Sequence, residues 1–588
     1  STFSALQGFI RFEVKTIGGR KVANSLFVFV THSTKTMADT VEVTDGWKAA
    51  AFSVVLVLMA AVAIYSVLVT WWASRSEGGE ASKAQVKSTE DFITARSRVD
   101  VWKMAFSLYA SVLGGSVVTG PASYASFAGL LGLASYAVAV GAPLLVVAWC
   151  GGLARTADPE ATSLPNFLLR RFGVRLYAEA ANEGVCGLTF LKPGQATATL
   201  SALLTLFVMG VALLAEYATV GTLFRSFVAC SDGLAAVPTI FVGLLTIAYT
   251  VVGGLYISVL TDRIQAVVSF ILVIFLAIYL ASDFNGDTSG PVTEDMKGFS
   301  YAGWSSVFTM PISLISGTIY SEALWQRVWA AEDEQALRRA SVGACFFVML
   351  VVFFFGFGGW LALWSGKANW DTDPNLYFFT LFSSGSNGIL DSFAGLLTLS
   401  CAALMGQGAM DSLQNGITAT LSSTLLKDKP LAWTRILVVL VNIPLAIIGA
   451  TSWVNDVLTL FLLSNMITVS CLFPLVVAVI PGDLAKEYIT EATVWSGCIG
   501  GVLGSIIFGI DQVGGDVADG LDMTFMSNGY GWDYFLVALL SSIGCTLIGI
   551  ALSWVYRQFL EQKQGKGKGE STNAATTDAS PNPDAAAA

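Results

Sequence analysis

The stretch VWKMAFSLYASVLGGSVVTGPASYAS at residues 101–126 decides how this chain folds. It is long and apolar enough to cross a bilayer, yet Gly114-Gly115 and Gly120-Pro121 interrupt it. Inside a helix, proline costs roughly 3 kcal/mol and glycine about 1 kcal/mol relative to alanine. Because lipid offers no partners to freed backbone groups, two arrangements remain open. One is a kinked helix that neighbouring Ser and Thr side chains repair. The other is an unwound helix whose freed carbonyls and helix ends bind an ion and a solute.

The composition of the whole chain is that of a polytopic membrane protein. Of the 588 residues, 54% are hydrophobic and 13% are charged, and the mean hydropathy is +0.66, whereas a soluble protein has about 25% charged residues. The net charge of −10 gives no indication of a nucleic-acid partner. The one histidine, His32, precedes the first expected span, and the eight cysteines lack metal-site spacing. We therefore expect no enzyme, no cofactor, and no metal other than a coupling sodium ion.

Long apolar segments recur along the chain, each with about 18 or more mostly apolar residues, enough to cross roughly 30 Å of hydrocarbon. Basic residues gather in one alternating set of loops and acidic residues in the other. The positive-inside rule then predicts an integral plasma-membrane protein with its N-terminus outside and its C-terminus in the cytoplasm. We expect about thirteen transmembrane helices, near 49–72, 101–123, 127–150, 196–228, 234–256, 261–282, 302–323, 339–364, 388–424, 432–450, 456–480, 492–510 and 532–556.

A second interrupted segment, YAGWSSVFTMPISLISGTIYSEALW at 301–325, comes five spans after the first and is broken at Pro311 and Ser316-Gly317. Two interrupted spans at corresponding places indicate an inverted-repeat transporter. The expected parts are an extracellular segment 1–47, a first helix and cytoplasmic linker 48–100, core repeats 101–282 and 283–480, two additional helices 481–558, and a disordered cytoplasmic tail 559–588. Residues 1–36 precede Met37, and we interpret them as a gene-model extension.

Three motifs resemble those of the solute:sodium symporter family. They are YTVVGGLYISVLTDRIQ at 249–265, which matches a GGL, TD and Q signature, WQRVWAA at 325–331, and SLPNFLLRRFG at 163–173. The resemblance runs from about residue 90 to about residue 510, with a more distant likeness to the urea-transporter branch. It implies an all-α fold of the leucine-transporter type. The core would be a five-plus-five inverted repeat, with one extra helix before it and two after it.

The same resemblance implies a sodium site between the first and the eighth core helix. Its backbone ligands on the first core helix fall on Ala110 and Leu113. On the eighth, CAALMGQGAMDSLQN at 401–415, the carbonyl donor falls on Met405 and the two hydroxyl positions fall on Gly408 and Ala409, which carry no hydroxyl. A hard cation prefers several oxygen ligands. We therefore expect sodium dependence to be weak or absent.

Asp411 and Asp262 complete the candidate cation residues. A carboxylate within the bilayer costs about 2.5–3.5 kcal/mol on insertion scales and is functional by default. Asp411 is expected to bind the cation directly or to carry a proton; the alternative is a structural carboxylate bonded to Ser412 or Gln407. The alternative for Asp262 is a water-facing carboxylate that pairs with its neighbour Arg263.

Glu216 and Tyr217, near the middle of the third core span, are the sharpest polar anomaly in the chain. Glu216 is expected to face either a cationic group of the substrate or a donor such as Tyr136 or Asn465; a protonated, structural Glu remains the alternative. Ser and Thr in membrane spans are more often packing residues bonded to the backbone. The other candidates for the substrate site are Tyr109, Ser111, Gly114, Gly115, Ser116, Ser313, Ser316, Thr318 and Tyr320.

These features predict a symporter that moves a small polar solute by alternating access and is coupled to sodium or protons. The alternatives are a proton-coupled or uncoupled transporter without sodium dependence, and a transporter-like nutrient sensor. The expected partners are the solute and the lipid bilayer, with no nucleic acid and no obligatory protein partner. At the cytoplasmic end of the second interrupted span, we expect Glu322 to form an ion pair with Arg327.

Overall fold

The computed structural model describes residues 15–17, 20–22, 45–75, 88–183, 194–284, 286–382, 393–426, 429–451 and 457–576. His32, most of the expected extension 1–36 and the last part of the expected tail, 577–588, lie outside the described residues. Two short strands near the N-terminus, β1 (Lys15–Ile17) and β2 (Arg20–Val22), pair antiparallel.

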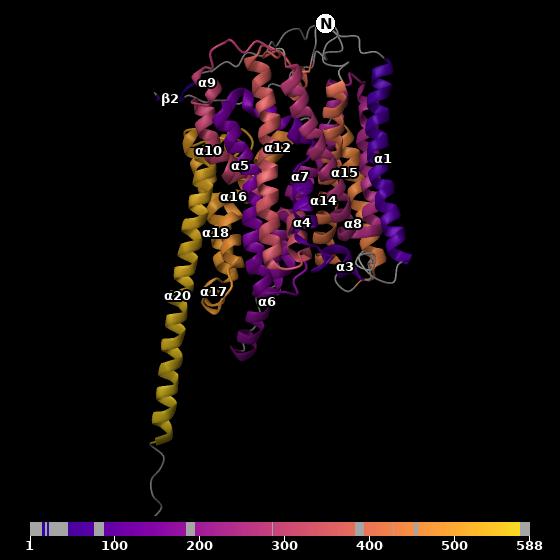
Figure 1. Cartoon of the computed structure of the whole chain (residues 1–588). Coiled ribbons are helices and arrows are strands. Elements are labelled where there is room, and N and C mark those ends of the chain that lie inside the picture. Colours follow the sequence, from indigo (N-terminus) through magenta and orange to yellow (C-terminus); the bar gives the residue numbers. More distant parts are fainter. Residues whose placement is uncertain are drawn as a thin grey trace, which may run out of the picture.

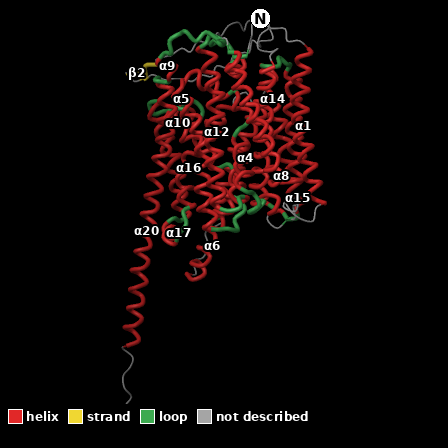
Figure 2. Tube along the Cα trace, in the orientation of Figure 1, coloured by secondary structure: helices red, strands yellow, loops and turns green. Residues whose placement is uncertain are grey.

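Ten helices in the described residues are long and apolar enough to cross a membrane. They stand side by side in one bundle, with loops gathered at its two ends (Figures 1 and 2). The expected all-α membrane fold is thus confirmed, while the count of thirteen stays a prediction. The ten helices are α1 (Asp45–Arg75), α5 (Gly120–Ala157), α7 (Gln195–Ser226), α8 (Asp232–Asp283), α12 (Glu334–Trp364), α14 (Phe393–Leu425), α15 (Leu431–Ala450), α16 (Val457–Val479), α18 (Glu491–Gln512) and α20 (Trp532–Thr576).

Shorter elements complete the chain. In Figure 1, α9 lies at the end of the bundle where β2 is seen, and α3, α6 and α17 lie at the opposite end, which we call the α6 end. The remaining short elements interrupt or connect the long helices. The shorter elements are α3 (Thr89–Thr94), α4 (Val101–Val112), η2 (Gly115–Val118), α6 (Leu164–Glu183), α9 (Glu294–Lys297), α10 (Tyr301–Ile319), α11 (Glu322–Ala330), η3 (Pro374–Leu376), α13 (Tyr377–Thr380), α17 (Asp483–Tyr488) and α19 (Val517–Phe525).

The first predicted interruption is confirmed. Helix α4 ends at Val112, Leu113 is extended, and a single 3₁₀ turn, η2, follows before α5 begins at Gly120. Pro121 lies at the start of α5, where the missing N–H of proline is harmless. Gly120-Pro121 is therefore a helix start, and the helix is broken at Gly114-Gly115.

The second interruption lies later than the sequence predicts. Helix α10 continues through Pro311 and Ser316-Gly317 to Ile319, and the break falls between Ile319 and Glu322, where α11 begins. The Ser316 hydroxyl donates to the Ser313 carbonyl at 2.7 Å, so it bonds within the helix. The predicted break residues are thus part of a continuous helix. The interruption itself is confirmed, but its predicted position is wrong.

Two glycines turn the chain sharply at the ends of the bundle. Gly129 in α5 has φ +64° and Gly254 in α8 has φ +58°, a left-handed region that favours glycine. A Cβ on Gly254 would lie 2.5 Å from the carbonyl oxygen of Phe92 in α3. The second glycine of the GGL motif therefore serves a tight turn against α3, and it divides α8 into two arms.

A backbone strap joins the start of the first broken helix to the end of the second. Val99, just before α4, forms a parallel bridge with Ala331, just after α11. The Val99 N–H donates to the Ala330 carbonyl at 3.0 Å, and the Glu332 N–H donates to the Val99 carbonyl at 2.9 Å. Arg155 of α5 donates to the Val328 and Ala331 carbonyls at 3.0 and 2.9 Å. The two broken helices are thus tied together at the α6 end.

The last helix, α20, extends beyond the bundle (Figure 1). It continues to Thr576, so the disorder predicted from residue 559 is corrected for 559–576. The run FLEQKQ at 559–564 consists mostly of good helix formers. A helix that has already been nucleated can propagate through such residues at low cost.

Candidate functional site

The break in the first core helix is closed by a carboxylate from α7. Glu216 Oε2 accepts a 2.8 Å hydrogen bond from the Gly115 backbone N–H, and Oε1 accepts a 2.7 Å hydrogen bond from the Ser116 hydroxyl. A Cβ on Gly114 would lie only 2.0 Å from Oε1. Glycine at position 114 therefore allows the carboxylate to lie in the break. There it accepts a hydrogen bond from the Gly115 N–H, which the break has freed.

Small residues of α14 pack against the same place. A Cβ on Gly115 would lie 2.8 Å from the Ala402 carbonyl oxygen. A Cβ on Gly406 would lie 3.5 Å from the Gly115 nitrogen and 3.6 Å from Glu216 Oε2. The first broken helix, α7 and α14 therefore meet at the Glu216 carboxylate.

Glu216 is a buried carboxyl group without a basic partner among the described residues. Its side chain is 7% exposed, and no Lys or Arg of the described part of the chain forms an ion pair with it. Its donors belong to the broken helix and not to Tyr136 or Asn465, which the sequence suggested. A carboxylate has about four lone-pair sites, so the bonds from Gly115 and Ser116 leave acceptor capacity for a ligand that donates hydrogen bonds.

The other substrate-site candidates around the first break differ in the partners of their hydroxyl groups. Tyr109 is buried and its hydroxyl has no partner among the described residues. The Ser111 hydroxyl donates to the Leu108 carbonyl at 2.9 Å, which is the backbone bonding usual in membrane helices. Tyr217 points away from the break, because its hydroxyl accepts from Gln414 Nε2 at 2.8 Å and its ring contacts Gly449. Tyr217 thus packs against α14 and α15 in this structure.

The candidates on the second broken helix are mostly bonded within the protein. The Tyr320 hydroxyl donates to the Cys471 carbonyl at 2.9 Å, and Thr468 donates to the Ser316 hydroxyl at 3.3 Å. Ser313 is buried with its hydroxyl unpartnered among the described residues, and Thr318 is half-buried. Ser313 is therefore the candidate on α10 with a hydroxyl left over for a solute.

The expected cation residues are brought together in part. An ideal Cβ on Gly408 of α14 would lie 3.5 Å from the Ala110 carbonyl oxygen of α4, so these two positions face each other. Leu113 lies in extended backbone just past α4, and Met405 and Ala409 are buried on α14. The same Gly408 Cβ would lie 3.0 Å from Oε1 of Gln265. Gln265 belongs to the GGL, TD and Q signature, but sequence reasoning assigned it no role.

Asp262 belongs to a fully buried ion pair. Its Oδ2 accepts from Arg327 Nη2 at 2.7 Å and from the Ser107 hydroxyl at 2.6 Å, and both charged side chains are 0% exposed. Arg327 also donates from Nη2 to the Ser412 hydroxyl at 2.7 Å and from Nε to the Ser107 hydroxyl at 2.8 Å. This network joins α4, α8, α11 and α14. The alternative suggested for Asp262, a water-facing carboxylate paired with its exposed neighbour Arg263, is wrong.

Glu322 does not pair with Arg327, so that prediction is also wrong. Glu322 is fully buried, and its Oε2 accepts from the Leu164 N–H at 3.1 Å. The bond satisfies a free N–H at the start of α6. In sequence, Glu322 and Arg327 are five residues apart, which does not place them on one face of a helix.

Asp411 lies against α8 and not against α4. Its Oδ1 accepts from the Thr250 hydroxyl at 2.8 Å and from Asn415 Nδ2 at 2.9 Å. Its Oδ2 has no partner among the described residues, and the side chain is 0% exposed. Neither suggested structural partner is used, since Ser412 accepts from Arg327 and Gln407 donates to the Met59 carbonyl. Asp411 is therefore a buried carboxylate with one oxygen available.

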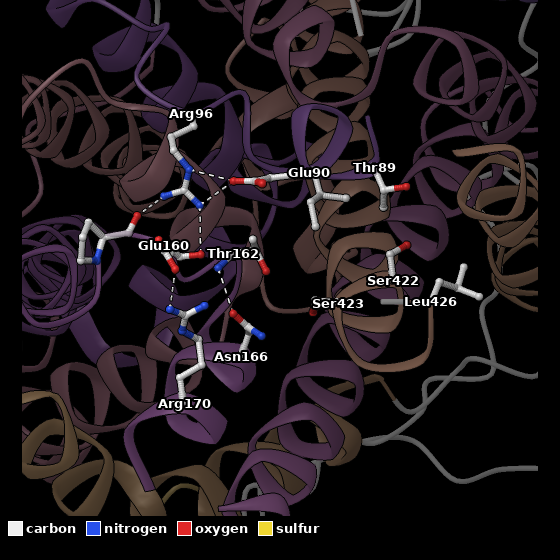
Figure 3. A pocket seen from close by; sticks show the side chains of 12 residues that line it. Thr89, Glu90, Arg96, Glu160, Thr162, Asn166, Arg170, Ser422, Ser423 and Leu426 are labelled. Atoms are coloured by element: carbon white, nitrogen blue, oxygen red, sulfur yellow. Dashed lines mark hydrogen bonds and ion pairs between the residues drawn. The ribbon is translucent and has the colours of Figure 1, made fainter. Parts of the chain in front are cut away.

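A cavity of about 580 Å³ lies at the α6 end, between α3, the connection from α5 to α6, and the end of α14 (Figure 3). Arg96 crosses it, donating to Glu90 Oε1 at 3.0 Å and to the Ala161 carbonyl at 2.8 Å, and Arg170 donates to Glu160 at 2.8 Å. None of the substrate or cation candidates lines this cavity. It is therefore separate from the site at the break.

Comparisons with known proteins agree with the transporter-type architecture. No protein-family model matches the chain. The chain is 24% identical to the spermidine transporter DUR31 of Candida albicans (strain SC5314 / ATCC MYA-2876) over 426 residues, 72% of this chain and 75% of that protein. A Na⁺-coupled sialic acid symporter, solved in a substrate-bound outward-open state, aligns with a TM-score of 0.61 at 16% identity, covering 85% of this chain and 97% of the other. The chain thus has the fold of a leucine-transporter-type membrane transporter.

Proposed function

We propose that this protein is a secondary active transporter that carries a small cationic amine across a membrane by alternating access. The observation that carries the proposal is the Glu216 carboxylate, which lies buried in the break of the first core helix with no basic side chain paired to it. A carboxylate at this depth is costly unless it has a functional partner. An ammonium group, which only donates hydrogen bonds, is the complementary ligand. The likeness to a spermidine transporter supports the same substrate class.

The arrangement suggests how the solute is bound. The amine would approach Glu216 from the side of the unwound turn, where Ser116 already bonds to the carboxylate and Gly406 leaves space on α14. The buried hydroxyls of Tyr109 and Ser313 are the further candidates for polar contacts. Unwound helix segments at the middle of the bilayer are where transporters of this architecture bind their solutes.

For the coupling ion we propose a proton, carried by Asp411. Asp411 is buried and keeps one unpartnered oxygen among the described residues, while its other oxygen is held by Thr250 and Asn415. Asp262 and Arg327 are the charged groups nearest in electrostatic reach, and they neutralise each other as an ion pair. The hydroxyl-free positions Gly408 and Ala409 favour a proton over sodium.

Topology and family are part of the same proposal. We propose a plasma-membrane location, and the loop charges support an N-terminus outside and a C-terminus in the cytoplasm. The two glycine turns and the two broken helices support about thirteen spans, with repeats at 101–282 and 283–480. The motifs at 163–173, 249–265 and 325–331 support membership of the solute:sodium symporter family.

Uptake into proteoliposomes tests the function. Purified protein should accumulate radiolabelled spermidine, and an uncharged amide of similar size should not compete for it. Glu216→Gln should reduce spermidine uptake about tenfold or more, because it removes the charge that binds the ammonium. Glu322→Gln is the matched control, since Glu322 is another buried carboxylate that bonds only to the start of α6. Specific binding of spermidine without uptake would favour the sensor, and no binding at all would contradict the substrate class.

A further inference from the structure

Gln265, on the second arm of α8, is a buried amide close to the buried Tyr249 hydroxyl. Its side chain is 1% exposed, and neither Oε1 nor Nε2 meets the geometry of a hydrogen bond with any described atom. Buried side-chain amides in proteins are almost always bonded, because leaving one unpaired costs about 1–3 kcal/mol. The unpaired amide therefore indicates a group that exchanges partners as the protein works.

The neighbours of Gln265 show which partner is within reach. An ideal Cβ on Gly408 would lie 3.0 Å from Gln265 Oε1 and 3.5 Å from the Ala110 carbonyl oxygen. The amide and this carbonyl thus lie on either side of a residue that has no side chain. Ala110 is in the last turn of α4, where carbonyls have no intrahelical donor. Gln265 Nε2 carries the donor that this carbonyl lacks.

We propose that Gln265 determines the ion preference of the coupling site: when α4 and α8 close around Gly408, its amide donates to the Ala110 carbonyl in place of a cation. The inference rests on the proposed function, since it concerns how that transporter is coupled. In this arrangement α4 and α8 are joined by a neutral hydrogen bond beside Gly408. The contact between α4 and α8 then forms without a bound ion.

Gly408 offers sodium no charged ligand and no oxygen of its own. The two oxygens nearest to an ideal Cβ at this position are the Ala110 carbonyl and Gln265 Oε1, both uncharged. Of the nearby carboxylates, Asp262 is paired with Arg327, and Asp411 is bonded through Oδ1 to Thr250 on α8. Since a hard cation requires several oxygen ligands, the amide is the better occupant of this position.

The first test converts the amide into a cation ligand. Gln265→Glu keeps the shape of the side chain but replaces its donor with a carboxylate oxygen facing the Ala110 carbonyl. Thermal unfolding of the purified full-length protein is compared in sodium chloride and potassium chloride at equal ionic strength and alkaline pH. An ion that binds only the folded state raises the melting temperature. We expect no difference between the two salts for the wild type and a higher melting temperature in sodium for Gln265→Glu.

A second set of variants keeps the test decisive if Gln265→Glu does not fold. Gly408→Ser with Ala409→Ser supplies both hydroxyls but leaves the amide in place, so we expect uptake to stay independent of sodium. Adding Gln265→Ala to this pair frees the position, and sodium should then raise uptake about fivefold or more, the lower end of typical site–site coupling.

The outcomes separate this inference from the proposed function. A sodium-specific stabilisation of the wild type overturns the inference, and so does the absence of any sodium effect in both the folded Gln265→Glu protein and the triple variant. The unfolding measurement needs no substrate. If wild-type protein carries no amine while Gln265→Glu is stabilised by sodium, the inference stands and the proposed substrate class fails.

Discussion

The Glu216 carboxylate accepts a 2.8 Å hydrogen bond from the Gly115 backbone N–H, although 101 residues separate the two in the chain. The freed backbone of the broken helix is thus satisfied by a carboxyl group, which lies where three parts of the bundle meet. In the proposed function, a solute that binds Glu216 would therefore contact the break itself, and one side chain would couple binding to the geometry of the broken helix.

Gly114→Ala should disable transport. The added methyl group would lie 2.0 Å from Glu216 Oε1, so the carboxylate must leave the break. We expect spermidine uptake to fall about tenfold or more. The matched control is Gly210→Ala on α7, where nothing lies within 4 Å of the new Cβ. This control should keep its uptake, with stability up to about 1 kcal/mol higher because alanine favours the helix. Equal uptake by the two variants would contradict the role of the break.

Arg327→Met should strongly destabilise the protein. It leaves the Asp262 carboxylate buried and unpaired, a change that typically costs about 3–5 kcal/mol. The double variant Arg327→Met with Asp262→Leu should recover much of the lost melting temperature, because both charges are then gone. Arg170→Met is the control, since Arg170 is 41% exposed and its surface pairs are worth about 0–1 kcal/mol. A double variant as unstable as the single one would show that the ion pair is not the source of the loss.

Gly254→Ala should loosen the turn of the GGL motif. The position has φ +58°, and the added Cβ would lie 2.5 Å from the Phe92 carbonyl oxygen. Both effects are unfavourable, and we expect a loss of about 1–3 kcal/mol, measured as a lower melting temperature. Gly343→Ala in α12 has open space around its Cβ and should be neutral or stabilising. If both variants melt at the same temperature, the turn tolerates a side chain, and glycine is not required at position 254.

Labelling of intact cells tests the orientation. In a background with Cys186→Ser, Cys230→Ser and Cys545→Ser, a cysteine placed at Ser289 should react with an impermeant maleimide, because the loop charges predict that the acidic loops face outside. Cysteine at Lys429, in the connection from α14 to α15, should react only after permeabilisation. Both positions are exposed, so accessibility within the protein does not decide the result. The opposite pattern of labelling would reverse the topology.

A proton gradient should drive uptake. We expect spermidine accumulation to rise when the outside is more acidic, and to be unchanged when sodium replaces potassium at constant pH. Asp411→Asn should abolish the response to the gradient while exchange of substrate continues, because an amide cannot carry the proton but can still accept from Thr250. A steep, saturable dependence on sodium in the wild type would contradict this coupling.

The breaks in the helices were predictable, whereas the partners across the bundle were not. Gly114-Gly115 signals an interruption because glycine acts on the backbone of its own helix. Pro311 gave a misleading signal, since α10 accommodates it and breaks after Ile319. Local sequence therefore indicates that a helix is strained, but packing decides where the strain is released.

The buried charges illustrate the same limit. Glu216, Asp262 and Asp411 stand out in apolar segments because a charge in lipid demands a reason. Their partners Gly115, Arg327 and Thr250 lie 101, 65 and 161 residues away. Helix spacing relates only residues three or four apart. Gln265 stood in a recognised motif, yet its place beside Gly408 emerged only from the packing of α8 against α14.

The bridge between Val99 and Ala331 joins the two broken helices into one unit at the α6 end. Its backbone hydrogen bonds run in both directions, from Val99 to Ala330 and from Glu332 back to Val99, and Arg155 pins the same segment to α5. The start of α4 and the end of α11 are therefore connected directly through the backbone. An opening of this end that moved one helix alone would have to break these bonds, whereas a joint swing of both about the α5 anchor leaves them intact.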